Sequence, residues 1–177
     1  MTRPPIKHLG NYYRYWLQRY PDVKNPRFDR YCGQVLNLKN RQPSAIAYFT
    51  ERLKSEIPAQ GVALCTVPSS TQGKLDTGIR AVAQALVNQK DTDRVDATSC
   101  LVRTRSLPKA AHGGPRLVSA HLDTIEVQHE GLIAGKTVYL LDDVVTTEAS
   151  LTACWRLLTD VGATSVTCIA LAKTVRE

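Results

Sequence analysis

A chain of 177 residues, 43% hydrophobic and 22% charged, has the size and composition of one globular domain with its own core. It has no apolar run of membrane-spanning length, and no signal-peptide core follows Met1, so we expect a cytoplasmic protein without a membrane partner. The formal net charge of +7 favours anionic partners, whether small phosphorylated compounds, nucleotides or nucleic acid.

The five cysteines are odd in number, widely spaced and without a Cys-x-x-Cys pair. Cys65, Cys100 and Cys168 lie inside apolar runs. This pattern predicts reduced core residues rather than disulfides or zinc ligands, as in a reducing compartment.

Residues 1–43 are predicted as a segment of their own, ahead of a domain at 44–177. Aromatic rings beside arginines can stack a free nucleobase or the bases of single-stranded nucleic acid. Such rings more often pack a small subdomain, and we favour that interpretation. Residues 31–38 are compatible with a strand. The aromatic and basic residues of this cluster are Tyr12, Tyr13, Arg14, Tyr15, Trp16, Arg19 and Tyr20.

Two helices flank a buried strand between residues 44 and 87. The first helix is predicted from Ser44 to just before Pro58, the strand at 61–67, and the second helix after a polar loop. A loop between a strand and a helix N-terminus is a suitable place for an anion. Apolar residues at helical spacing are Ile46, Phe49, Leu53 and Ile57, then Ile79, Val82, Ala83 and Leu86. The loop comprises Ser69, Ser70, Thr71, Gln72, Gly73 and Lys74.

A long basic segment from residue 103 to about residue 121 follows a strand predicted at 95–102. Long loops inside compact domains are usually functional or mobile, whereas a solvated surface loop is the alternative for any single residue. His121, Leu122 and Ile125 are expected to begin the strand that closes the segment. Neither His112 nor His121 has metal-ligand spacing. The other basic residues of the segment are Arg103, Arg105, Lys109 and Arg116.

Residues 137–151 carry the most informative pattern. A buried strand is predicted at 137–141, and a helix from Ser150 to the glycine at Gly162. Two acids, Asp142 and Asp143, and a hydroxyl-bearing turn lie between them. A helix that begins directly after a strand offers backbone N–H groups and a positive dipole end to a phosphate, and carboxylates accept hydrogen bonds from a diol. The pattern predicts a ribose 5-phosphate site; a plain turn with Asp and Thr as turn and cap residues is the alternative.

Residues 165–171 are predicted as a further strand, with Lys173 just past its end as a second-rank candidate for contact with an acceptor molecule. The alternation of strands and helices predicts a three-layer α/β domain with a mainly parallel sheet.

The run Leu-Leu-Asp-Asp-Val-Val-Thr-Thr-Glu-Ala-Ser at 140–150 resembles the phosphoribosyl-pyrophosphate (PRPP) motif of type I phosphoribosyltransferases. Val67 and Pro68, with the polar and basic loop after them, resemble the competence-type (ComF-like) branch. Glu148 stands where that family usually has glycine. The resemblance covers roughly residues 44–173, and it implies the type I phosphoribosyltransferase fold with a small N-terminal hood.

The resemblance implies a cytoplasmic transferase of nucleotide metabolism that moves the phosphoribosyl group of PRPP to a nitrogen base and releases pyrophosphate. Mg²⁺ would be bound through PRPP rather than directly by the protein. It implies catalytic roles for Asp142 and Asp143 at the ribose hydroxyls, and for Arg103, Arg105, Lys109 and Arg116 on a lid. The 5-phosphate would lie on Val144, Val145, Thr146, Thr147, Glu148, Ala149 and Ser150. Pyrophosphate would be held by Ser69, Ser70, Thr71, Gln72, Gly73 and Lys74.

Expected partners are PRPP and an unidentified base, with a homodimer as an open alternative. Two other functions stay open. One is a non-catalytic regulator of the same fold that binds PRPP or a nucleotide. The other, which we favour less, is a nucleic-acid-associated protein of an uptake or defence system.

Overall fold

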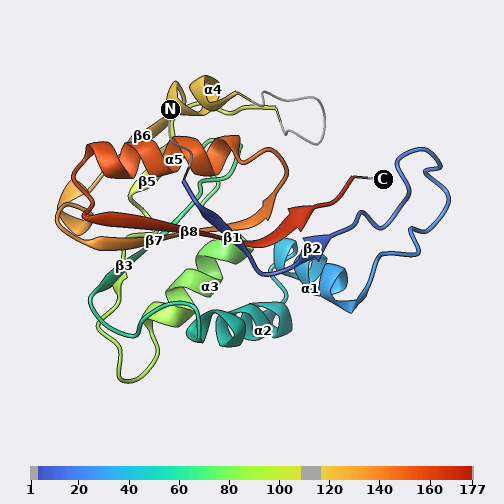
Figure 1. Ribbon diagram of the computed structural model, residues 1–177, viewed down its shortest axis with the longest axis horizontal. Helices are drawn as coiled ribbons and strands as arrows, with labels where there is room; N and C mark the ends of the chain where they lie inside the picture. The colour runs from blue at the N-terminus through green and yellow to red at the C-terminus, as the bar shows by residue number, and fades with distance from the viewer. Residues whose placement is uncertain (1–3, 109–116, 177) are drawn as a thin grey trace.

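The computed structural model describes residues 4–108 and 117–176 and has a central sheet covered by helices on both faces (Figure 1). The strand order is β1-β8-β7-β3-β4, with β2 also pairing with β8, and every pairing in this sheet is parallel. The predicted α/β class with a mainly parallel sheet is therefore confirmed. The strands are β1 (Ile6–His8), β2 (Asn11–Tyr12), β3 (Val62–Thr66), β4 (Val95–Asp96), β7 (Thr137–Val145) and β8 (Ser165–Thr174).

Helices form the two outer layers, as predicted. One face of the sheet carries α1 (Arg30–Lys39), α2 (Pro43–Lys54) and α3 (Gly78–Val87), and the other carries α5 (Ala149–Asp160) (Figure 1). A separate two-stranded sheet pairs β5 (Leu101–Arg103) antiparallel with β6 (Ile125–Val127). The short helices α4 (Val118–Leu122) and η2 (Glu130–Leu132) lie before and after β6. None of the helices in the described part of the chain has the length and apolarity to cross a membrane.

The two faces of the sheet bury separate cores. Leu141 of β7 and Ile169 of β8 pack with α1, α2 and α3, whereas Leu140 and Cys168 pack with α5. Strands buried on both faces have continuous apolar runs instead of alternating ones, which is the pattern that predicted them. All five cysteines are free and buried, as expected.

The interpretation of residues 31–38 as a strand is wrong, because these residues form most of α1. The Asp29 side chain accepts a hydrogen bond from Cys32 N at 2.8 Å and so caps the helix. Cys32, Val35 and Leu38 recur every three residues and are all fully buried. A spacing of three places these side chains on one face of a helix but on alternating faces of a strand.

Three further predictions about element limits need correction. The strand predicted at 95–102 is divided between β4 and β5, which belong to different sheets. His121 and Leu122 lie in α4, so the closing strand begins only at Ile125. Lys173 lies within β8, which ends at Thr174, and not past the end of the strand.

Candidate functional site

The loops that follow β3 and β7 leave the sheet at the same edge. The two strands are paired as far as Thr66 and Leu141, and Val67 N then donates to Leu141 O at 2.9 Å. Beyond this bond β3 continues into the 69–74 loop and β7 into the 146–148 turn. The structure thus brings together both predicted phosphate-binding segments, at the edge where open α/β sheets bind ligands.

The N-terminus of α5 has no side-chain cap. Its first-turn N–H groups lack intrahelical partners, and the positive end of the helix dipole lies there. The α1 and α3 helices differ, because Asp29 and Thr77 cap them. Free N–H groups at a helix N-terminus suit a phosphate.

The side chains of the 144–150 segment divide between core and surface. Val144 is half-buried, and Val145 and Ala149 are buried in the core, so only their backbone is placed to meet a ligand. Thr146 Oγ1 lies 3.0 Å from Thr174 Oγ1 of β8, which ties the turn to the last strand. Thr146 is exposed, whereas Thr147 and Ser150 are half-buried.

The two acids of β7 differ in burial. Asp142 is only 9% exposed and lies on the α5 side, where its charge contributes to the raised pKa of Cys154 after burial itself. Burial, and then the charge of Asp143, raise the pKa of Asp142 well above its ordinary value. Asp143 is half-buried, and its Oδ1 accepts from Val144 N at 2.6 Å. Asp143 is therefore the acid that a ligand can reach.

Glu148 has a positive φ of 61°. This left-handed conformation favours glycine, which explains why a glycine is usual at such a turn. The Glu148 carboxylate lies 3.4 Å from Lys173 Nζ and 3.7 Å from His8 Nε2. Burial, and then Lys173, lower the pKa of His8, so at neutral pH the imidazole is neutral. Lys173 is the counter-ion of Glu148.

Arg103 was predicted on a loop, and this placement is wrong because it is the last residue of β5 and only 4% exposed. Its Nε donates to Ser69 O at 3.1 Å and its Nη1 to Thr124 Oγ1 at 2.7 Å. Its Nη2 lies 3.4 Å from His121 Nδ1, and burial and then Arg103 lower the pKa of His121 to about 4. Arg103 therefore holds the start of the 69–74 loop through its hydrogen bond to Ser69 O.

The chain after β5 runs along the same loop. Leu107 N donates to Ser70 O at 2.8 Å, and Gln72 N donates to Ser106 Oγ at 2.9 Å. Arg105, on the same stretch, is exposed. Lys109 and Arg116, the other two predicted lid cations, lie outside the described residues.

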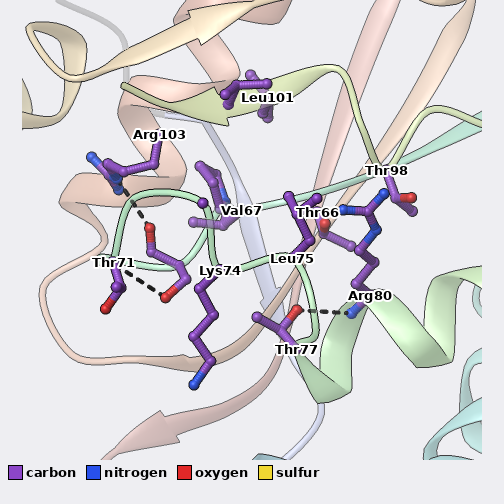
Figure 2. A pocket seen from close by; sticks show the side chains of 14 residues that line it. Thr66, Val67, Thr71, Lys74, Leu75, Thr77, Arg80, Thr98, Leu101 and Arg103 are labelled. Carbon is purple, nitrogen blue, oxygen red and sulfur yellow. Dashed lines mark hydrogen bonds between the residues drawn. The ribbon is translucent and has the colours of Figure 1, made fainter. Parts of the chain in front are cut away.

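A hollow of about 40 Å³ lies between the 69–74 loop, the start of α3 and β5 (Figure 2). Arg80 of α3 lines it, and our sequence reasoning missed this residue. The available signal was a lone arginine in the first turn of a helix, where a positive charge opposes the helix dipole.

The aromatic and basic residues of the N-terminal segment were expected to pack a small subdomain, and only some of them are packed. Tyr12 packs against the core on the α1–α3 side of the sheet, as expected of a structural ring. Trp16 and Tyr20 are 51% and 55% exposed, and Trp16 packs edge to face against Tyr15 with ring centroids 4.7 Å apart, so these two rings are only partly packed. This stretch lies near the C-terminal end of the chain (Figure 1).

Within residues 4–108 and 117–176 no group of three or more His, Cys, Asp or Glu could hold a metal ion. Asp143 offers a suitable carboxylate, since it is half-buried at this sheet edge and its Oδ1 accepts from Val144 N. Hard cations such as Mg²⁺ prefer oxygen ligands, so the residues present fit such an ion.

Comparison with known proteins gives similarity of structure alone. No family model and no curated protein matches the sequence. The chain is similar to a hypoxanthine phosphoribosyltransferase from Staphylococcus aureus, with a TM-score of 0.43 and 10% identity. It is also similar to the hypoxanthine phosphoribosyltransferase of Trypanosoma cruzi, with a TM-score of 0.40 and 10% identity. Each match covers 81% of this chain and 76% of the other chain. Likeness at this level does not identify the reaction.

Proposed function

We propose that the protein is a phosphoribosyltransferase that binds PRPP with Mg²⁺ and transfers the phosphoribosyl group to a nitrogen base, with release of pyrophosphate. The observation that supports this proposal most strongly is that three polar groups lie at one edge of the sheet. The uncapped N-terminus of α5 suits the 5-phosphate, Asp143 suits the ribose diol, and the neighbouring 69–74 loop suits the pyrophosphate. These three groups are the parts of PRPP.

In this proposal the protein acts by positioning and electrostatics. Asp143 holds the ribose hydroxyls, while Asp142 orients it, because Asp142 Oδ1 accepts from Asp143 N at 2.9 Å. Thr147 and Ser150 add hydroxyl donors to the phosphate seat. Mg²⁺ bound to PRPP supplies charge neutralisation at the departing pyrophosphate. Fixing the reacting groups in place lowers the barrier without a covalent intermediate on the protein.

Binding of PRPP tests this proposal directly. A ligand that binds only the folded state at a hundredfold excess over its Kd stabilises that state by about 2.7 kcal/mol. PRPP with Mg²⁺ should therefore raise the melting temperature, and Asp143→Asn should remove most of the shift. Asp123→Asn, which alters an exposed acid at the end of α4, should retain it. Absence of any shift for the wild-type protein at millimolar PRPP would end the proposal.

A second candidate function is a non-catalytic regulator that binds PRPP. Glu148 favours it, since a carboxylate next to a phosphate seat is unusual for a transferase of this kind. Release of pyrophosphate from PRPP, followed with a panel of purine and pyrimidine bases, separates the two. A protein that binds PRPP but releases no pyrophosphate with any base would be the regulator.

We expect Glu148→Gly to change PRPP affinity by less than about tenfold, or about 1.4 kcal/mol. The reason is that Lys173 already balances the Glu148 charge. Titration calorimetry with PRPP and Mg²⁺ measures the change. The converse control is Lys173→Met, which leaves the carboxylate uncompensated and should weaken binding. A hundredfold gain in PRPP affinity for Glu148→Gly would mean that Glu148 repels the phosphate. That result would contradict a catalytic role and favour the regulator.

A further inference from the structure

Residues 14–27, the aromatic loop, project outward between β2 and α1 (Figure 1). Antiparallel backbone bonds close the loop: Leu17 N donates to Val23 O at 3.0 Å, and Asn25 N donates to Tyr15 O at 2.8 Å. Asn25 is buried at the root of the loop. The backbone is thus shaped before any partner binds, and a pre-shaped loop loses less conformational entropy on binding than an unstructured one.

The aromatic loop exposes an unusual share of the apolar side chains of the molecule. Seven large hydrophobic side chains are exposed in the described part of the chain, and four of them lie within positions 15–23 of this loop. Apolar side chains that gather at one place on a surface mark a binding surface. The four residues are Tyr15, Trp16, Tyr20 and Val23.

Cations lie beside the rings of this loop. Arg19 Cζ is 5.9 Å from the centre of the Tyr20 ring, and Lys24 Nζ is 5.4 Å from that of Tyr15. A nucleic-acid strand offers flat bases to the rings and phosphates to the cations, whereas an apolar protein surface would bury the cations without a counter-ion. The single acid within residues 14–27 is Asp22, and the four basic residues are Arg14, Arg19, Lys24 and Arg27.

The exposed rings favour a single strand over a duplex. A ring stacks only on a base whose face is free, and in a duplex each base is already stacked on its neighbours. Insertion of a ring between paired bases would cost several kcal/mol of unstacking for each step. A single strand avoids this cost, and stacking on an aromatic side chain does not depend on which base is present.

We propose that the aromatic loop binds single-stranded nucleic acid, with Trp16 and Tyr20 stacked on bases and Arg19 and Lys24 paired with phosphates. DNA and RNA offer this same chemistry, and both are tested. This function is additional to the proposed transfer of a phosphoribosyl group and does not depend on it.

Fluorescence anisotropy of the full chain with labelled oligothymidylate and oligouridylate tests the proposal. Strands of about twelve nucleotides lie within the range that one small domain covers. Trp16→Ala and Tyr20→Ala should each weaken binding by about fivefold or more, which corresponds to at least about 1 kcal/mol for a lost base stack. Both rings are exposed, so unchanged melting temperatures should show that the variants fold.

The phosphate contacts have a test and a matched control of their own. Arg19→Gln should weaken binding and reduce the slope of log K against log salt by about 0.7, the value for one phosphate of a single strand. Arg52→Gln removes an exposed arginine that lies over the rings of Tyr31 and Tyr48, away from the aromatic loop. It should leave both the affinity and the slope unchanged.

Tryptophan emission gives a readout that a merely structural role would not change. The chain has two tryptophans, and Trp155 packs against the core on the α5 side of the sheet. A base stacked on Trp16 should quench the emission of the wild-type protein. Trp16→Phe should retain most of the affinity, because a ring is still present, but should lose the quench.

Four outcomes would overturn the proposal. Equal affinity for a duplex of the same length would mean that phosphates alone are recognised. Competition by thymidine 5′-monophosphate as strong as that by the oligonucleotide would indicate a nucleotide site instead of a strand site. Equal behaviour of Trp16→Ala and Arg52→Gln would remove the aromatic loop from the contact. Absence of binding to either strand at physiological salt would leave the exposed rings as a surface for a protein partner. The proposed transfer reaction would stand in all four cases, because none of these measurements involves PRPP.

Discussion

The Gly78→Ala variant is expected to lose about 3 kcal/mol of unfolding free energy. A Cβ atom at Gly78 would lie 2.1 Å from Leu38 O and 2.9 Å from Leu38 C. These are backbone atoms of α1, so rotation of a side chain cannot relieve the clash, and α1 and α3 must move apart. Because α3 carries Arg80, the same movement should also displace the wall of the hollow beside the 69–74 loop.

Thermal unfolding measures this effect, and another glycine provides the control. For a chain of this size, 3 kcal/mol corresponds to a decrease of about 6–12 °C in melting temperature. Gly33, on α1, has no atom within 4 Å of an added Cβ. Gly33→Ala should therefore leave the protein as stable or more stable by up to about 1 kcal/mol, since alanine has the higher helix propensity. Equal melting temperatures for the two variants would contradict the close approach of the helices.

The Asp142→Asn variant is expected to be more stable than the wild type at neutral and alkaline pH. Burial raises the pKa of Asp142 in the folded protein above its value in the unfolded chain. Between those two values the folded state binds more protons, so wild-type stability falls as the pH rises through this window. Each unit of difference corresponds to about 1.4 kcal/mol. Asparagine avoids the cost of burying a charge and retains the acceptor that holds Asp143 N.

Melting temperatures measured from about pH 4 to about pH 8 test whether wild-type stability falls as the pH rises. The difference between Asp142→Asn and the wild type should widen with pH, whereas Asp123→Asn should show no such trend. PRPP affinity should fall less for Asp142→Asn than for Asp143→Asn, because Asp142 is assigned a positioning role. A variant that is less stable than the wild type at neutral pH would show that the Asp142 carboxylate is stabilising.

Periodicity predicted the elements whose burial is regular along the chain. In α3, Ile79, Val82, Ala83 and Leu86 are all buried as expected. The β3 strand and the continuous apolar runs of β7 and β8 are confirmed for the same reason. The β1 and β2 strands were missed, since three and two residues are too few to show a period. Pairing with β8 is what makes them strands.

The α1 helix shows a different limit. Its apolar positions are three apart, but Tyr31, Leu36 and the β-branched Val35 obscured that spacing and favoured a strand. The Asp29 cap and the packing of α1 against α2 and α3 decide in favour of the helix. Here tertiary contacts override local propensity.

The sequence by itself determined the α/β architecture and the two polar loops that follow β3 and β7, because side-chain period and turn composition are local properties. Only the tertiary structure decided four arrangements of side chains. It buried Asp142 and left Asp143 within reach, paired Glu148 with Lys173, joined Arg103 to Ser69 of the 69–74 loop by a hydrogen bond, and placed Arg80 on the wall of the hollow beside that loop. The physical reason is distance along the chain. Each of these settings depends on groups from different strands or helices, and their meeting is fixed by sheet register and helix packing rather than by neighbouring residues.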